Sequence, residues 1–250
     1  MEPRGLATVA KIFVQLPERL AGVIQLITLK TRPVSIFLFG SRARDDFLDL
    51  SDYEFGVLYA KDQIPAEVDF RNLITQAGCG FYHYEIDAFI LGTLDLPFEQ
   101  SIFIRSAIIG GKTVWGEQII ELMEYPPITV VSLMREIKFQ LGRASDALVC
   151  FQLGHISTSA RLFMKSCLWG TRCLSILKSK DFPISYLAVI EAARKLDLGE
   201  YGDLPKKALS ARLSSEVEKP DLFRNVRYLS RFIERQILAA YRSSGDCFLL

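Results

Sequence analysis

The hydrophobic pattern of this chain changes at Pro126-Pro127. Before these prolines, short apolar runs typical of strands alternate with stretches of helical periodicity. After them, helical periodicity continues with little strand signal, and several glycines and prolines separate the stretches. The pattern predicts an α/β (α+β) domain with a small mixed sheet over residues 1–125, followed by an all-α helical bundle over residues 126–250.

Both domains are expected to contain several elements. Strands are expected at 34–39, 53–59 and 81–91, and helices of the first domain at 6–30, 65–78 and 97–109. Five helices are expected in the second domain, at 128–152, 157–179, 183–198, 205–217 and 220–242.

The charge balance limits which partners the whole chain would attract. The 250 residues carry 30 Lys and Arg against 29 Asp and Glu, a formal net charge of +1. Half of the residues are hydrophobic, which suffices for a sizeable core and excludes a disordered or fibrous protein. The net charge gives no strong sign of nucleic-acid binding, so any contact with a nucleic acid must be local. One basic helical stripe is visible, whose simplest interpretation is a solvated face: Arg224, Arg227, Arg231 and Arg235.

Cysteine usage and hydropathy indicate the compartment. The five cysteines are scattered and contain no CxxC pair, which argues against a zinc ribbon, a redox motif or a disulfide framework. The first residues lack the continuous apolar core of a signal peptide, and no uncharged run approaches the ~20 residues of a membrane span. We expect a cytoplasmic protein with reduced thiols and no membrane partner.

A possible phosphate site follows the first predicted strand. The strand runs into Gly40-Ser41, where a short helix is expected to begin. Backbone N–H groups at such a turn bind anions, and the Ser41 hydroxyl with Arg42 or Arg44 adds donors. These four residues are candidates for nucleotide binding, although the Gly-Ser dipeptide by itself is far more often part of an ordinary turn.

Two carboxylates come next on the second predicted strand. Asp52 and Glu54 stand at i and i+2, so both side chains share one face of the strand. Adjacent carboxylates repel unless a cation lies between them, and Mg²⁺ takes such ligands together with water and substrate phosphates. The alternative is a solvated edge that carries two unrelated acids.

A third predicted strand supplies further acids. His83, Glu85 and Asp87 alternate with apolar residues and would form one polar face. If this strand lies beside the second, Glu85 or Asp87 would lie next to the first two carboxylates. Acids from two strands, facing a phosphate-binding turn, predict a two-metal site for phosphoryl or nucleotidyl transfer.

These motifs resemble the signature of the DNA polymerase β-like nucleotidyltransferase superfamily. The resemblance is carried by Gly40-Ser41, the segment Ser51-Asp52-Tyr53-Glu54 and the later strand acid, within about residues 36–59 and 84–88. The usual motif is Asp-x-Asp, and this chain has Asp-x-Glu. Kanamycin nucleotidyltransferases share that departure, and their two-part plan is similar to the one predicted here.

The resemblance implies an activity and its cofactors. A nucleoside triphosphate, with ATP the first expectation, and two Mg²⁺ ions would serve transfer of a nucleoside monophosphate to an acceptor hydroxyl with release of pyrophosphate. An aminoglycoside is the first acceptor to consider, and a protein or RNA acceptor is the alternative. A non-catalytic nucleotide-binding or scaffold protein is the rival from another class, and the apolar helical half suits a homodimer.

The resemblance also implies roles for individual residues. Asp52 and Glu54 would be metal ligands and catalytic, and Ser41 and Arg44 would contact the triphosphate. The third ligand is Asp87 by the superfamily pattern and Glu85 by that of the kanamycin enzymes. Glu136 would be the catalytic base that takes the proton from the acceptor hydroxyl; without the resemblance, a solvated helix residue would be the simpler interpretation.

Overall fold

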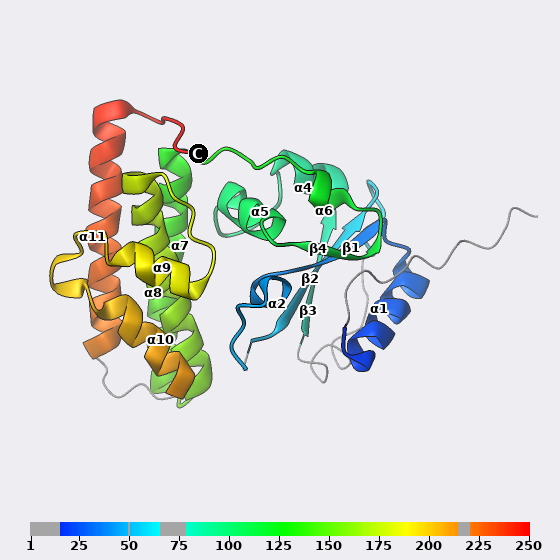
Figure 1. The fold of residues 1–250 in the computed structure, drawn as a ribbon, viewed down its shortest axis with the longest axis horizontal. Coiled ribbons are helices and arrows are strands. Elements are labelled where there is room, and N and C mark those ends of the chain that lie inside the picture. Colours follow the sequence, from blue (N-terminus) through cyan, green and yellow to red (C-terminus); the bar gives the residue numbers. More distant parts are fainter. Residues whose placement is uncertain (1–15, 50, 66–78, 215–220) are drawn as a thin grey trace, which may run out of the picture. The chain divides into compact units, whose positions relative to one another are not determined.

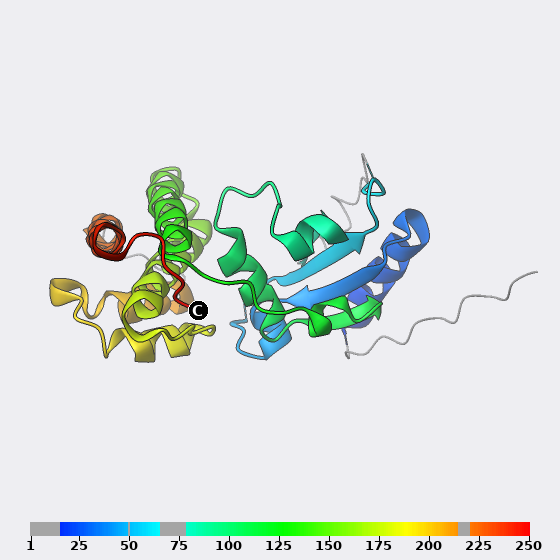
Figure 2. The ribbon, with the colours of Figure 1, turned by 90° about the horizontal axis from the view of Figure 1, so that it is seen from above.

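The computed structural model describes residues 16–49, 51–65, 79–214 and 221–250. Within them the chain forms two compact units (Figures 1 and 2). Unit 1 takes in the chain up to Leu94 together with Ile104–Tyr125, and unit 2 takes in Asp95–Phe103 together with Pro126–Leu250. The division into one domain over residues 1–125 and another over residues 126–250 stays a prediction, and each unit is described by itself below.

Unit 1 is built on a four-stranded mixed sheet in the order β3-β2-β1-β4 (Figure 1). The strands are β1 (Ser35–Phe39), β2 (Tyr53–Tyr59), β3 (Cys79–Glu85) and β4 (Lys112–Gly116). β1 lies antiparallel to β2 and β4, whereas β2 and β3 are parallel. The small mixed sheet confirms the predicted fold class of this part.

Helix α1 (Glu18–Thr31) covers one face of this sheet. Its buried residues Leu20, Ile24 and Ile27 pack with Ile36 and Val57 from the central strands, because one stripe of the helix is apolar. The opposite face carries the aromatic side chains of Phe37, Phe39, Tyr82 and Tyr84. Phe89, which follows β3, packs against them, and the ring centroids of contacting pairs are 5.5 to 5.9 Å apart.

Among the described residues outside the bundle, four further helices are short. They are α2 (Ser41–Arg44), α4 (Ile86–Leu91), α5 (Gln100–Ile108), which is divided between the units, and α6 (Ile119–Leu122). The predicted strand 81–91 is wrong beyond Glu85, where the chain turns into α4. Asp87 lies in the first turn of that helix, where a negative charge is favourable, and Gly92 ends it in the left-handed conformation. The predicted helix 65–78 and the start of helix 6–30 lie outside the described residues.

Unit 2 contains the five predicted helices. They are α7 (Val130–Gln152), α8 (Ile156–Ser179), α9 (Tyr186–Ala193), α10 (Leu204–Ser214) and α11 (Asp221–Ser244). Small side chains let α7 and α8 approach closely, since the Ser166 hydroxyl donates to the Gln140 carbonyl at 2.6 Å and that of Ser159 to the Ala147 carbonyl at 2.7 Å. Among the described residues, no helix is both long enough and apolar enough to cross a bilayer.

The last residues of the chain complete the beginning of α7. Thr129 caps the helix through a reciprocal pair of hydrogen bonds with Ser132. The N–H of Val130 donates to the Cys247 carbonyl at 3.2 Å, and that of Val131 to Asp246 Oδ1 at 2.8 Å. Donors of the first turn, which have no partner inside the helix, are satisfied in this way.

Candidate active site

The turn after β1 has a backbone conformation that favours glycine. Gly40 has φ 76° and ψ −160°, a region that other residues adopt only at a cost in strain. It leads into α2, whose first residue, Ser41, is buried. The first N–H groups of a helix have no partner within it, so this turn presents donors suited to an anion.

The carboxylate of Glu54 lies against this turn. Antiparallel pairing places Phe39 opposite Glu54, and a Cβ added to Gly40 would collide with Glu54 Oε2. Asp52 stands two residues earlier, directly before β2 begins at Tyr53. Asp52 is exposed and Glu54 is partly exposed. The structure thus brings Glu54, one of the two predicted carboxylates, to the predicted glycine turn. A place for the Asp52 side chain beside it stays a prediction.

The predicted third carboxylate is not beside this pair. In the parallel register Glu54 lies opposite Gly80, whereas Glu85 lies opposite Tyr59 at the far end of β2. Gly80 and Glu85 are five residues apart along β3, a distance of about 16 Å. Because five is an odd number, Glu85 points to the opposite face of the sheet from Gly80 and Glu54. Glu85 instead accepts a hydrogen bond from the Asp62 N–H at 3.0 Å, and Asp87 lies in α4. The predicted convergence with Asp52 and Glu54 is therefore wrong for both residues.

The carboxylate pair fits a magnesium ion that the substrate helps to hold. No cluster of three or more His, Cys, Asp or Glu side chains with metal-binding geometry occurs among the described residues. Mg²⁺ commonly binds through one or two carboxylates and completes its octahedral shell with water and phosphate oxygens. Asp52 and Glu54 fit one such ion, and the structure gives no support for the two protein-built sites expected from three acids.

Arg42 does not extend toward the turn as a simple phosphate donor. Its Nε donates to the Ser51 carbonyl at 3.1 Å and its Nη2 to the Asp49 carbonyl at 3.3 Å. Its guanidinium lies 3.8 Å from the centre of the Phe47 ring and 4.8 Å from that of Tyr53. Arg42 thus holds the loop that precedes Asp52, a positioning role that sequence reasoning missed.

Arg44 lies at the last position of α2 and is largely buried. Its Nη2 forms an ion pair with Asp46 at 3.2 Å, and its aliphatic stem lies so close to Gly110 that a side chain there would meet it at 2.5 Å. Its Nε is buried and has no hydrogen-bond partner among the described residues. The structure fixes Arg44 close to the turn, and its contact with a triphosphate stays a prediction.

Tyr82 is a further candidate on the face of the carboxylate pair. Its ring folds over Gly80, the residue opposite Glu54, and contacts the ring of Phe39 at a centroid distance of 5.9 Å. It is 44% exposed, so an aromatic surface borders the carboxylates. Sequence reasoning missed Tyr82, and the strand alternation along residues 81–87 could have indicated it, had the parallel register been expected.

Burial and the negative charges of the site raise the pKa of two neighbouring side chains. For Cys79, burial raises the pKa of the thiol to about 11; the charge of Arg19 opposes this rise, and the charge of Asp52 adds to it. Burial also raises the pKa of Tyr84, with smaller contributions from Tyr82 and Glu54. Both groups stay protonated at neutral pH, so neither is an anionic nucleophile there.

His83 belongs to the other face of the sheet. Its Nδ1 is 2.8 Å from the hydroxyl of Tyr59, which also donates to Thr31 Oγ1 at 3.1 Å. Burial lowers the pKa of the imidazole, which favours the neutral ring in the folded protein. His83 is therefore a satisfied structural histidine.

Glu136 lies in unit 2, on α7, and is buried rather than solvated. It is 5% exposed and its Oε1 accepts a hydrogen bond from Gln140 Nε2 at 2.6 Å. Gln140 Oε1 in turn accepts a hydrogen bond from Arg143 Nη1 at 3.0 Å. The neighbouring Arg135, which would have paired with Glu136 at a surface, lies 3.7 Å from Glu99 instead. A buried carboxylate in a polar chain is compatible with a base, and that role stays a prediction.

Comparisons with solved structures identify the fold. The chain is similar to spectinomycin adenyltransferase AAD(9) from Enterococcus faecialis, solved with ATP and spectinomycin, at 14% identity and a TM-score of 0.59; the alignment covers 88% of this chain and 98% of that one. A nucleotidyltransferase-like protein from Exiguobacterium sibiricum 255-15 matches at 13% identity and a TM-score of 0.32, over 91% and 76% of the two chains, which is too loose to support an inference. No protein-family model matches, and neither does any curated protein sequence. The first likeness shows that this chain has the nucleotidyltransferase fold.

Proposed function

We propose that the protein is a Mg²⁺-dependent nucleotidyltransferase that moves a nucleoside monophosphate from a triphosphate to an acceptor hydroxyl. The observation that carries the proposal is the Glu54 carboxylate against the turn at Gly40-Ser41, with Asp52 two residues earlier in the chain. The fold shared with an adenyltransferase supports it, and ATP is the proposed donor because that structure contains ATP.

In this mechanism each residue has one task. The N–H groups of the turn, the Ser41 hydroxyl and Arg44 bind the phosphates, and Asp52 and Glu54 hold Mg²⁺ against them. When bound, the ion neutralises charge on the phosphate oxygens. The acceptor oxygen forms a bond to the α-phosphorus, the bond to the β-phosphate oxygen breaks, and pyrophosphate leaves. Glu136 takes the proton of the acceptor hydroxyl.

The proposed acceptor is a small hydroxyl-bearing antibiotic of the aminoglycoside or aminocyclitol kind. The similar adenyltransferase was solved with spectinomycin, which makes that compound the first to test. The homodimer and the cytoplasmic location expected from the sequence stay predictions.

The test is transfer of labelled AMP to spectinomycin and to a panel of aminoglycosides, with Mg²⁺ and with a chelator. Asp52→Asn and Glu54→Gln should each abolish transfer. Asp49→Asn is the matched control, because it removes one exposed carboxylate from the same loop and should leave transfer unchanged. Equal transfer by wild type and Asp52→Asn would contradict the proposal.

A nucleotide-binding protein without turnover is the second candidate. It is favoured by one observation, that neither Glu85 nor Asp87 joins the carboxylate pair. Isothermal titration with ATP separates the two candidates. ATP binding that persists without Mg²⁺ would favour this second function, provided that no pyrophosphate is released in the presence of any acceptor tested.

A further inference from the structure

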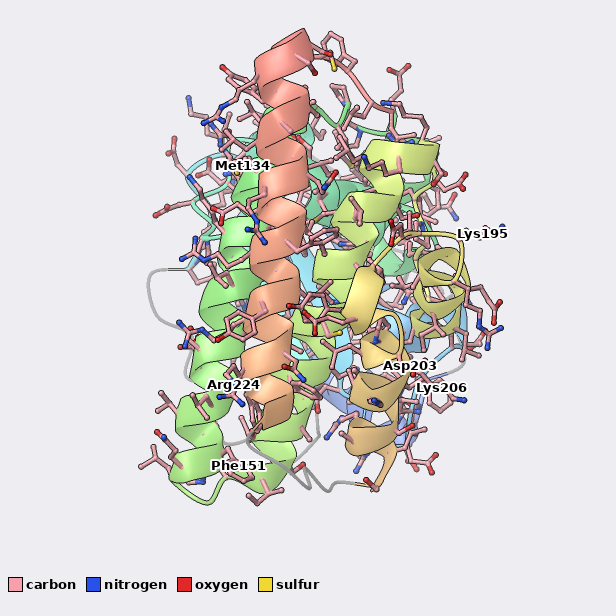
Figure 3. The ribbon with its side chains drawn as sticks, turned by 90° about the vertical axis from the view of Figure 1, so that its left-hand side faces the viewer. Met134, Phe151, Lys195, Asp203, Lys206 and Arg224 are labelled. Atoms are coloured by element: carbon pink, nitrogen blue, oxygen red, sulfur yellow. The ribbon has the colours of Figure 1, made fainter. Side chains whose placement is uncertain are left out.

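Helix α11 presents a straight row of arginines on its outer side. We call this surface the α11 arginine stripe, and it consists of Arg224, Arg227, Arg231, Arg235 and Arg242. All five side chains are exposed. Figure 3 views α11 from the side on which Arg224 is labelled, and no other element of unit 2 lies in front of the helix.

The packing of α11 fixes the direction of the stripe. The opposite side of the helix is buried in the bundle, where Val226, Ile233 and Ile237 have no exposed surface. A helix held in this way cannot turn its charged side inward. At 1.5 Å per residue, the stripe extends over about 27 Å from Arg224 to Arg242.

The positive charge of the stripe is concentrated against a nearly neutral background. Residues 221–244 contain five arginines and two carboxylates, whereas the whole chain has a net charge of only +1. Arg231 forms an exposed ion pair with Glu234 at 2.7 Å, an interaction of a kind that contributes little and rearranges easily. Neither Arg227 nor Arg235 lies within 4 Å of a described carboxylate.

The chemistry of this surface fits a nucleic-acid backbone better than a protein. Guanidinium groups bind phosphate through paired hydrogen bonds, and nucleic-acid interfaces are more polar and more positive than protein interfaces. The apolar surface within this row is supplied by Tyr228, which is 51% exposed, and it is small for the centre of a protein interface. A tyrosine among arginines also suits stacking with an unpaired base.

We propose that the α11 arginine stripe is a sequence-independent binding surface for the phosphate backbone of single-stranded RNA or DNA. Its five guanidinium groups provide at most five phosphate contacts along one strand. The surface lies outside the carboxylate pair and the glycine turn, so binding does not require the transfer reaction.

The test is fluorescence anisotropy of a labelled oligouridylate of about 20 nucleotides, long enough to cover the stripe, between about 50 and 200 mM salt. Five phosphate contacts predict that log K falls with log salt at a slope of about −3.5 for a single strand. The double variant Arg227→Gln/Arg235→Gln should lower the slope to about −2 and weaken binding roughly 50-fold at about 50 mM salt.

A second double variant controls for net charge. Lys61→Gln/Lys195→Gln also removes two exposed cations, and Lys195 is labelled away from α11 in Figure 3. This variant and Asp52→Asn should both bind like wild type, which separates the surface from the proposed active site. Thermal melting by circular dichroism shows that each variant is folded. Undetectable binding, an equal loss in both double variants, or tighter binding of an acidic protein such as poly-aspartate would overturn the proposal.

Discussion

The Nε of Arg42 donates a 3.1 Å hydrogen bond to the carbonyl of Ser51, the residue directly before Asp52. A side chain from α2 thereby sets the backbone from which a proposed metal ligand projects. The same guanidinium reaches the Asp49 carbonyl and lies over two aromatic rings, so its position depends on its planar shape as well as its charge.

Replacing Arg42 should therefore affect the loop more than the charge of the site. We expect Arg42→Lys to lose nearly as much activity as Arg42→Ala, about 10- to 100-fold in kcat/KM, because an ammonium cannot reproduce two divergent hydrogen bonds and a stacked plane. Hydrogen exchange should increase over residues 45–52 in both variants. Full activity of the lysine variant would show instead that only the charge of Arg42 matters.

Gly40→Ala should destabilise unit 1 and remove nucleotide binding. The new Cβ would meet the Glu54 carboxylate in a backbone region that alanine avoids, at a cost of about 1 to 3 kcal/mol. The matched control is Gly142→Ala on α7, where a Cβ has open space and should stabilise the protein by about 0.5 to 1 kcal/mol. Urea unfolding measures both, and an unchanged midpoint for Gly40→Ala would contradict the described turn.

Glu136→Gln should separate catalysis from folding. The amide oxygen can still accept the hydrogen bond from Gln140, so stability should change little, whereas a lost base should slow transfer by about 100- to 10,000-fold. Glu136→Leu would in addition leave the buried Gln140 amide without this acceptor and cost about 1 to 3 kcal/mol. A Glu136→Gln protein with normal kcat would assign the residue to the structure of α7 alone.

The neutral state of His83 should make unit 1 less stable in acid. Burial lowers the pKa of this imidazole in the folded state, so below about pH 6.5 the unfolded chain binds a proton more readily than the folded one. Stability is thus full above that pH and declines as the pH falls through the unfolded value toward the folded one. The fluorescence of Trp115 reports on unit 1 when Trp169 is replaced by Phe. Unfolding midpoints measured at several pH values then give the slope of stability against pH. His83→Gln should flatten this part of the slope, and an unchanged slope would exclude His83 as its source.

The parts of the fold that sequence reasoning predicted are those with a strong local pattern. β2 was predicted at its observed bounds and β1 within one residue, since both are short apolar runs that end at a glycine or in a polar segment. The Gly40 turn and the pair Asp52 and Glu54 come from the same short segment, and strand pairing places them together. Local sequence thus contains most of the candidate site.

The features that the sequence did not predict depend on the direction of β3 relative to β2 and on contacts between side chains that are distant in the sequence. Alternation along residues 81–87 indicates which side chains share a face, but not which strand end lies beside Glu54. A connection as long as that between β2 and β3 is typical of a parallel crossover, and this signal would have placed residues 79–80 beside the carboxylates. The hydrogen bond from Arg42 to the Ser51 carbonyl and the burial of Glu136 arise from tertiary contacts. The sequence around each residue does not indicate these contacts.

The closing of α7 by Asp246 and Cys247 has a consequence for synthesis. A nascent chain exposes α7 to solvent long before the ribosome has made the residues that receive its first N–H groups. The helical unit therefore cannot reach its final state helix by helix, in the order of translation. We expect its folding to be completed only after residues 246 and 247 have been synthesised, as one concerted event that joins them to the start of α7.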